Sequence, residues 1–191
     1  MNVYDFDRTL FPGDSSIHFW RFCMKRHPSV LLVIPRATAA MINYKRGKLS
    51  WSGVMQTFFR FLRYIPDISQ EVEAFWDKKL EKIHSWYLNE KKSSDDVIIS
   101  AAPEFLISSA AKRLGVRYIA TVMDSKTGII DGGEECSGDV KLRRFTEEYG
   151  DAEIDEFYSD SYLDTPLAKM AVRAFMVFDG EVKPWNFENT D

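Results

Sequence analysis

The chain has 191 residues and a net charge of −4 at pH 7, with 45% hydrophobic and 28% charged residues. This length suits one domain with a full hydrophobic core, or a core domain with a smaller insertion. The most apolar run, Val30–Ile34, is far shorter than the ~20 residues that span a bilayer, which excludes a transmembrane helix there. The N-terminus does not resemble a signal peptide, and the distant cysteines Cys23 and Cys136 match no metal-binding spacing. We therefore expect a cytoplasmic protein whose thiols stay reduced.

The first residues predict a short buried strand that ends in acids. Residues 1–4 are followed by Asp5 and Asp7, which flank Phe6. A buried sheet gains nothing from two carboxylates at the end of a strand, because burying charge is costly. Phosphoryl transfer does use such a pair: one acid attacks phosphorus, the other moves a proton, and a magnesium ion binds between them.

Residues 11–94 predict helices rather than strands. Apolar and aromatic side chains recur there at helical spacing, as in Phe75, Trp76, Leu80 and Ile83. We expect three or four helices whose aromatic side chains form the core of a helical bundle. The predicted division of the chain is a core of residues 1–11 and 95–191, with a helical insertion over residues 12–94.

The predicted insertion is strongly basic. Residues 15–66 contain no Asp or Glu and nine basic residues, so the rest of the chain carries a net charge of −13. The basic residues are Arg21, Lys25, Arg26, Arg36, Lys45, Arg46, Lys48, Arg60 and Arg63. Two interpretations stay open: solvated helix faces, or a surface that meets a phosphorylated substrate or an acidic lipid membrane. No aromatic-basic RNA-binding signature is present, so we expect no nucleic-acid partner.

After residue 94, short apolar runs alternate with helical segments. The sequence predicts strands at 97–99, 116–122, 157–158 and 175–178, and helices at 103–114, 139–149 and 165–174. Residues 124–136 predict an antiparallel hairpin appended to these elements. Because buried strands alternate with helices, we expect an α/β fold with a doubly wound, mostly parallel sheet.

Polar groups follow several of these predicted strands. Ser100 follows one strand, Asp160 and Asp164 follow another, and Lys141 stands near the start of a helix. Each also has an ordinary explanation: a cap for the serine and the two acids, and a solvated helix residue for the lysine. Ligands of doubly wound sheets bind beyond the carboxyl ends of the strands. We therefore expect these side chains to meet Asp5 in one crevice.

This ordered set of motifs resembles that of the haloacid dehalogenase-like (HAD) phosphohydrolases. Val3–Thr9 matches their hydrophobic strand followed by Asp-x-Asp-x-Thr, and Ser100 matches their strand-end Ser or Thr. Lys141 matches their lysine, and Tyr158–Asp164 matches their acidic motif. All four motifs occur in the family's order and span nearly the whole chain. The resemblance implies an HAD-like Rossmannoid core, and the insertion over 12–94 is similar to the α-helical cap of the phosphoserine phosphatase-like subgroup.

The resemblance also implies the cofactor and the role of each site residue. Magnesium (Mg2+) is the expected cofactor, since it prefers oxygen ligands and takes one or two carboxylates together with substrate phosphate. The implied site consists of catalytic Asp5 and Asp7; metal-binding Asp5, Asp7 (through its carbonyl) and Asp160; metal-supporting Asp164; and phosphate-binding Ser100, Lys141 and Thr9. Arg8 is a departure, because the family more often has glycine at that position.

The expected function is hydrolysis of phosphomonoesters through an aspartyl-phosphate, in the manner of a phosphoserine phosphatase, on a small phosphorylated metabolite. Two alternatives stay open: a lipid phosphomonoesterase, similar to a phosphatidylglycerophosphatase and held peripherally at the membrane by its basic cap, or a phosphotransferase with an acceptor other than water. A non-catalytic binding module is disfavoured, because every motif residue is intact. Within the cap, Arg36, Arg60 and Arg63 are candidates for substrate contacts.

Overall fold

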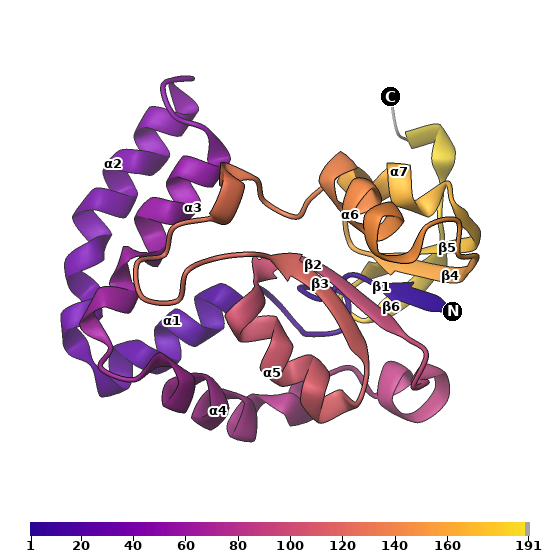
Figure 1. Ribbon diagram of the computed structural model, residues 1–191, viewed down its shortest axis with the longest axis horizontal. Helices are drawn as coiled ribbons and strands as arrows, with labels where there is room; N and C mark the ends of the chain where they lie inside the picture. The colour runs from indigo at the N-terminus through magenta and orange to yellow at the C-terminus, as the bar shows by residue number, and fades with distance from the viewer. Residues whose placement is uncertain (190–191) are drawn as a thin grey trace.

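The computed structural model describes residues 1–189 and is built around a six-stranded sheet (Figure 1). Its strands are β1 (Asn2–Tyr4), β2 (Val97–Pro103), β3 (Arg117–Thr121), β4 (Ile154–Ser159), β5 (Ala171–Phe178) and β6 (Glu181–Pro184). Their order is β3-β2-β1-β4-β5-β6, in which β6 is antiparallel to β5 and all other neighbours are parallel. The chain moves from β1 to one side for β2 and β3, and later to the other side for β4 and β5. The sheet is therefore doubly wound, and the predicted α/β fold class is confirmed.

The central strands send alternate side chains into two separate hydrophobic cores. Val3 belongs to one core and Tyr4 to the other, and Ile99 and Ile98 divide in the same way. The helices that cover the sheet are α5 (Glu104–Leu114) on the Tyr4 side, and α6 (Asp139–Tyr149) and α7 (Thr165–Ala168) on the Val3 side. A strand that is covered on both faces needs apolar residues at every position, which explains the continuous apolar runs in the sequence.

A helical segment lies between β1 and β2. It contains α1 (Ser15–Arg26), α2 (Ile34–Lys45), α3 (Trp51–Phe59) and α4 (Ile68–Lys79), with short turns η1 (Pro28–Val33), η2 (Arg60–Tyr64), η3 (Leu80–Lys82) and η4 (Tyr87–Lys91). The expectation of three or four helices without a strand is confirmed for this segment. Its aromatic residues Phe19, Phe75 and Trp76 belong to the same core as Tyr4. The boundaries of a core at 1–11 and 95–191 and a cap at 12–94 stay a prediction.

Short polar side chains begin three of these helices. A carboxylate oxygen of Asp14 accepts a hydrogen bond from the backbone N–H of Ile17 at the start of α1, at 2.9 Å. Ser50 caps α3 and Asp67 caps α4 in the same way. Each cap satisfies one of the backbone donors that a helix leaves unpaired in its first turn. Among residues 1–189, no helix is both long and apolar enough to cross a membrane.

The predicted helix at 165–174 is wrong in its second half. Helix α7 ends at Ala168, and β5 begins at Ala171. Ala171 pairs with Ile154 of β4, and Met176 and Val177 enter the two opposite cores. Pairing and burial outweigh the weak helical preference of this stretch. The β5–β6 turn at Asp179-Gly180, where both residues have positive φ, is a hairpin signal that the sequence analysis missed.

The predicted hairpin at 124–136 is wrong as a two-stranded element. The chain does reverse there, but as a tight turn with one isolated antiparallel bridge between Met123 and Ile130. A 3-10 turn follows directly, so no second strand extends beside β3. The 3-10 turns of the core are η5 (Asp131–Gly133), η6 (Tyr162–Asp164) and η7 (Phe187–Asn189). The reversal packs instead against the helical segment, where Gly128 lies against Phe59.

We predict that Gly128→Ala destabilises the fold more than Gly132→Ala. Both glycines have positive φ, so alanine costs about 1–2 kcal/mol at either position. At Gly128 the added Cβ would also lie 2.7 Å from backbone atoms of Phe59, whereas nothing lies within 4 Å at Gly132. The collision adds a further ~1–3 kcal/mol. Urea unfolding of both variants measures the difference, and equal free energies of unfolding would contradict the contact.

Candidate active site

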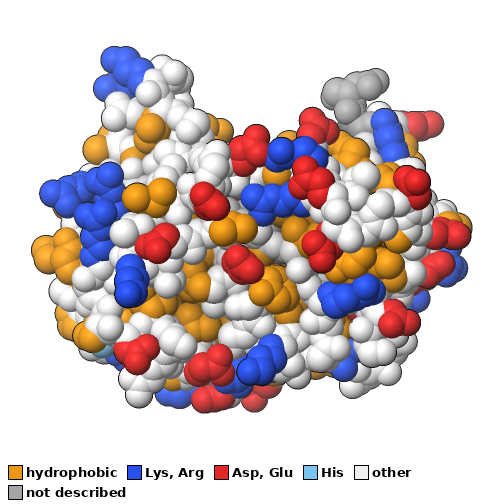
Figure 2. Space-filling model, viewed as in Figure 1, with side chains coloured by type: hydrophobic (Ala, Val, Ile, Leu, Met, Phe, Trp, Pro, Cys, Tyr) orange, Lys and Arg blue, Asp and Glu red, His pale blue; other side chains and the backbone are white. Residues whose placement is uncertain are grey.

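The predicted site residues gather at the carboxyl ends of the central strands. Asp5 directly follows β1, Ser100 lies in β2, and Asp160 follows β4, the other neighbour of β1. They line one pocket of about 220 Å³ together with Asp7 and Lys141. Its position is the point where the strand order reverses, as expected for a doubly wound sheet. In Figure 2 the surface is hollowed between the α2–α3 hairpin and the α6–α7 side of the molecule.

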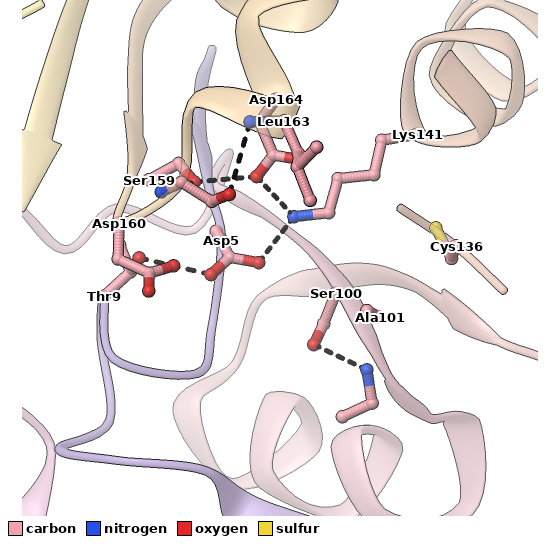
Figure 3. A network of polar contacts seen from close by, with 12 residues as sticks. Asp5, Thr9, Ser100, Ala101, Cys136, Lys141, Ser159, Asp160, Leu163 and Asp164 are labelled. Carbon is pink, nitrogen blue, oxygen red and sulfur yellow. Dashed lines mark hydrogen bonds and ion pairs between the residues drawn. The ribbon is translucent and has the colours of Figure 1, made fainter. Parts of the chain in front are cut away.

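The ammonium of Lys141 lies between two carboxylates (Figure 3). Its Nζ is 2.5 Å from Oδ1 of Asp5 and 2.7 Å from Oδ2 of Asp164. All three side chains are nearly inaccessible to solvent. Lys141 reaches this position from the first turn of α6. This helix begins directly after Gly138, whose φ is positive. The buried lysine therefore joins the acid after β1 to the acid that begins α7.

Two hydroxyl groups also donate hydrogen bonds to these carboxylates. Thr9 Oγ1 donates to Oδ2 of Asp5 at 3.2 Å, and Ser159 Oγ donates to Oδ2 of Asp164 at 2.7 Å. A backbone hydrogen bond of 2.8 Å from Asp5 N–H to the Tyr158 carbonyl ties the end of β1 to β4. Asp5 is thus fixed by its backbone and by both of its carboxylate oxygens, which orients it before any ligand binds.

Asp7 lies on the loop after Asp5, and its partner comes from α1. The backbone N–H of Ser15 donates to Oδ1 of Asp7 at 2.9 Å. Ser15 stands at the start of α1, so the partial positive charge of a helix N-terminus lies beside this carboxylate. Across the pocket, Ser100 Oγ accepts a hydrogen bond from Ala102 N–H at 3.1 Å, which leaves its own hydrogen available to donate.

The environment moves the pKa values of these groups in different directions. Burial, followed by the charge of Asp164, raises the pKa of Asp5 to about 6, although Lys141 opposes the shift. Burial and the neighbouring Asp14 raise the pKa of Asp7 well above its usual value. Burial alone would lower the pKa of Lys141, but Asp164 and Asp5 outweigh it and hold the ammonium charged. Both acids of the motif therefore bind their protons more tightly than an exposed aspartate does.

Negative charge is in excess in the pocket. The acids that line it are Asp5, Asp7, Asp14, Glu135, Asp160 and Asp164, and the cations are Arg8 and Lys141. Within residues 1–189, no three acid, histidine or cysteine side chains are close enough to hold a metal ion by themselves. Magnesium usually needs only one or two carboxylates, with the remaining positions filled by water and substrate phosphate. The donor set around Asp5 and Asp160 therefore fits this ion.

Arg8 lies at the mouth of the pocket. Its backbone has a φ of 60°, a conformation that favours glycine, and its N–H donates to the Gly13 carbonyl at 3.0 Å. Its guanidinium is largely exposed and lies 3.7 Å from a carboxylate oxygen of Asp160. The loop thus keeps the backbone shape that glycine would provide and adds an exposed positive charge beside Asp160.

The pocket also contains residues that the sequence analysis missed. Asp14, Trp51 and Glu135 line it, and the Trp51 indole donates a hydrogen bond to Glu135. Burial raises the pKa of Glu135, and this hydrogen bond opposes the shift. No spacing in the sequence links the start of α3 to the loop before α6, so no signal pointed to this pair. Asp14 caps α1, and nothing in the sequence analysis pointed to its position in the pocket.

The remaining candidates stay apart from the pocket. Arg36, Arg60 and Arg63 are exposed on the helical segment and do not line it. Their role as substrate contacts stays a prediction. None of the three histidines lines the pocket either.

Comparisons with known proteins agree with this fold. The family model described as haloacid dehalogenase-like hydrolase matches residues 3–169. A protein of unknown function from Bordetella pertussis Tohama I is similar in structure, with a TM-score of 0.70 and 20% identity over 91% of this chain and 87% of its own. Among curated protein sequences, none is similar enough to count as a match.

Two further solved structures have the same fold. A phosphoserine phosphohydrolase-like protein from Francisella tularensis subsp. tularensis SCHU S4 has a TM-score of 0.57 and 18% identity over 95% of this chain and 90% of its own. A substrate-bound phosphoserine phosphatase has a TM-score of 0.54 and 17% identity over 90% of this chain and 82% of its own. The predicted likeness to the phosphoserine phosphatase-like subgroup is confirmed for the fold. With a family match over most of its length, the chain belongs to the haloacid dehalogenase-like hydrolases.

Proposed function

We propose that the chain is a magnesium-dependent phosphomonoester hydrolase that acts through an aspartyl-phosphate on Asp5. The observation that carries the proposal is the Lys141 ammonium, fixed 2.5 Å from Asp5 in a pocket that also contains Asp7. Membership of a hydrolase family and the fold shared with a substrate-bound phosphoserine phosphatase support the same reaction class.

In the first step, a carboxylate oxygen of Asp5 attacks the phosphorus of the ester. The bond between phosphorus and the leaving oxygen breaks, and its electron pair stays on that oxygen. Asp7 gives its proton to the leaving oxygen, so the alcohol departs neutral and Asp7 becomes a carboxylate. The raised pKa of Asp7 supports this role, because the acid holds its proton until the leaving group needs it.

In the second step, water cleaves the aspartyl-phosphate. The Asp7 carboxylate takes a proton from water as its oxygen attacks phosphorus. The bond between phosphorus and Asp5 breaks, which releases inorganic phosphate and restores both acids. Throughout, Lys141 and the Ser100 hydroxyl orient the phosphoryl oxygens and offset their charge, while Thr9 braces the Asp5 loop.

Asp5, Asp160 and the Asp7 backbone carbonyl would hold magnesium, with Asp164 supporting this arrangement through Lys141. The ion supplies positive charge that offsets the repulsion between a phosphate dianion and the Asp5 carboxylate. At an effective dielectric constant of about 20, this repulsion is about 4 kcal/mol per pair of unit charges at ~4 Å. The excess of acids over cations in the pocket supports this assignment.

For the substrate we propose a small phosphorylated metabolite, in keeping with a pocket of about 220 Å³. A lipid phosphomonoester and transfer to an acceptor other than water are the alternatives. A screen of phosphorylated metabolites and lipids, with and without vesicles, separates the first two, and competition by added alcohols identifies the third. We place the enzyme in the cytoplasm, which agrees with free, buried thiols at Cys23 and Cys136.

We expect Asp5→Asn to abolish phosphate release from p-nitrophenyl phosphate in the presence of MgCl2, because an amide cannot form the aspartyl-phosphate. Asp7→Asn should slow release by about 10²–10⁴-fold through loss of the proton donor. Intact-protein mass spectrometry after rapid acid quenching should detect a phosphoryl adduct on the wild-type protein.

The matched control is Asp151→Asn, an exposed acid in a turn outside the pocket, which should leave the rate unchanged. Activity that persists in Asp5→Asn would show that Asp5 is not the nucleophile. Full activity in excess EDTA would contradict the proposed requirement for magnesium.

We predict that Lys141→Met destabilises the protein strongly, because it leaves Asp5 and Asp164 buried without a cation. Breaking such a buried pair typically costs about 3–5 kcal/mol. Combining Lys141→Met with Asp5→Asn should recover part of that loss, with a coupling free energy of about 1–3 kcal/mol. Urea unfolding in EDTA gives each free energy.

An exposed pair serves as the control for this cycle. Lys183→Met breaks a pair with Glu181 in which both side chains are mostly exposed, so it should cost less than about 1 kcal/mol. Strictly additive effects of the two pocket substitutions would contradict the ion pair between Lys141 and Asp5.

A further inference from the structure

Helix α2 is exposed on almost every side. Of its twelve residues, Ala40 is the one that is buried, and α2 packs mainly on α3. Figure 1 shows α2 and α3 as a hairpin at the edge of the molecule, away from β4 to β6. A helix of a globular protein normally buries an apolar stripe against the core. This one leaves an unpartnered face, which calls for an occupant.

Large hydrophobic side chains are exposed on α2 and on the segments next to it in the chain. Within residues 1–189, fifteen large hydrophobic side chains are exposed, and six of them lie within 31–51. These six are Leu31, Leu32, Ile34, Ile42, Tyr44 and Trp51. At about 100° per residue, Ile34 and Ile42 lie about 80° from each other on α2 and point away from Ala40, whereas Tyr44 lies on the Ala40 side and contacts Trp51 of α3. Large exposed apolar patches mark interaction surfaces. We call these six residues the α2 edge.

Basic residues surround the α2 edge. Arg36, Lys45, Arg46 and Lys48 are exposed, and none forms an ion pair with a carboxylate of residues 1–189. No Asp or Glu occurs in the sequence from 15 to 66. Along the outer side of the hairpin, Figure 2 shows Lys and Arg beside hydrophobic side chains, without acidic ones. The patch thus combines uncompensated positive charge with apolar surface.

We propose that the α2 edge docks on an anionic lipid bilayer. Apolar side chains between lysines and arginines suit an acyl boundary beneath acidic headgroups, and Trp and Tyr are favoured at that interface. A second copy of the chain fits poorly, since a symmetric contact would place this positive patch against itself. A small soluble anion could pair with the basic residues but would leave the apolar side chains uncovered.

The α2 edge leads to the catalytic pocket. The rings of Tyr44 and Trp51 are in edge contact, with centroids 5.4 Å apart, and Trp51 also lines the pocket with Asp5. A docked molecule would therefore have its pocket mouth beside the headgroups. This step rests on the proposed function: with the α2 edge docked, the lipid phosphomonoester given there as an alternative replaces the soluble metabolite as the expected substrate, with its phosphate in the pocket and its acyl chains outside.

Co-sedimentation with vesicles tests the docking without any need for turnover. The protein should bind vesicles of phosphatidylcholine and phosphatidylglycerol, bind phosphatidylcholine alone much more weakly, and dissociate as the salt concentration rises. Arg46→Glu with Lys48→Glu should lower the partition coefficient by more than about tenfold. Leu32→Ser with Ile42→Ser should also lower it, by about tenfold.

Matched controls separate the α2 edge from total charge and hydrophobicity. Lys82→Glu with Lys92→Glu changes the net charge by the same amount at exposed positions outside the edge and should leave binding unchanged. Val172→Ser removes a mostly exposed apolar residue of β5 and should also bind normally. Circular dichroism of each variant checks that the fold is retained.

Failure of the docking and failure of the proposed function give different results. No binding to anionic vesicles at low salt, or equal losses in the control variants, would overturn the docking. Dimerisation that disappears in Leu32→Ser with Ile42→Ser would assign the face to a second copy and overturn it too. Asp5→Asn should bind vesicles normally. Binding without hydrolysis of any phosphomonoester would overturn the function alone, and hydrolysis of p-nitrophenyl phosphate but not of phosphatidic acid in vesicles would overturn the lipid substrate.

Discussion

A single buried ammonium organises the centre of this protein. Lys141 lies between Asp5 and Asp164, and all three side chains are almost fully removed from water. Burying any one of these charges alone would be very costly, so each is tolerated because the others are present. The two acids share one cation, and Thr9 and Ser159 supply further hydrogen bonds. Such a cluster holds the Asp5 carboxylate in one orientation, which is what the proposed attack on phosphorus requires.

The topology explains how distant residues come to share that cluster. Lys141 and Asp5 are 136 positions apart, yet β1 lies at the centre of the sheet, and α6 leads directly into its neighbour β4. The backbone bond from Asp5 to Tyr158 fixes the relative height of the two strand ends. The parallel register therefore positions the side chains of the site as well as those of the core. A slip of one residue along β1 would turn Asp5 away from Lys141.

Much of this arrangement could be predicted from the sequence because its signals are local. Apolar runs followed by acids identified the strand ends at Asp5 and Asp160, and strand–helix alternation identified the doubly wound sheet. The strand at Ala171 was missed because alanine and lysine favour helix locally, while pairing with β4 decides the outcome. The contact between Trp51 and Glu135 was out of reach for a different reason: it depends on how two loops from separate segments approach each other, and no periodicity records that.

The aromatic core shared by the helical segment and the sheet has a consequence for how a ligand enters and leaves. Trp76 of α4 donates a hydrogen bond of 2.8 Å to the Leu106 carbonyl of α5 and packs on Phe6 and Phe11 beside the site. A hinge movement of the whole helical segment away from the sheet would separate the residues of this core. Ala40, the buried residue of α2, and Val54 of α3 lie outside both hydrophobic clusters, whereas Phe59 at the end of α3 belongs to the core that contains Tyr4. Bending of the outer part of the α2–α3 hairpin would therefore leave this core intact, and a ligand that enters past the hairpin would not disturb the side chains around Asp5.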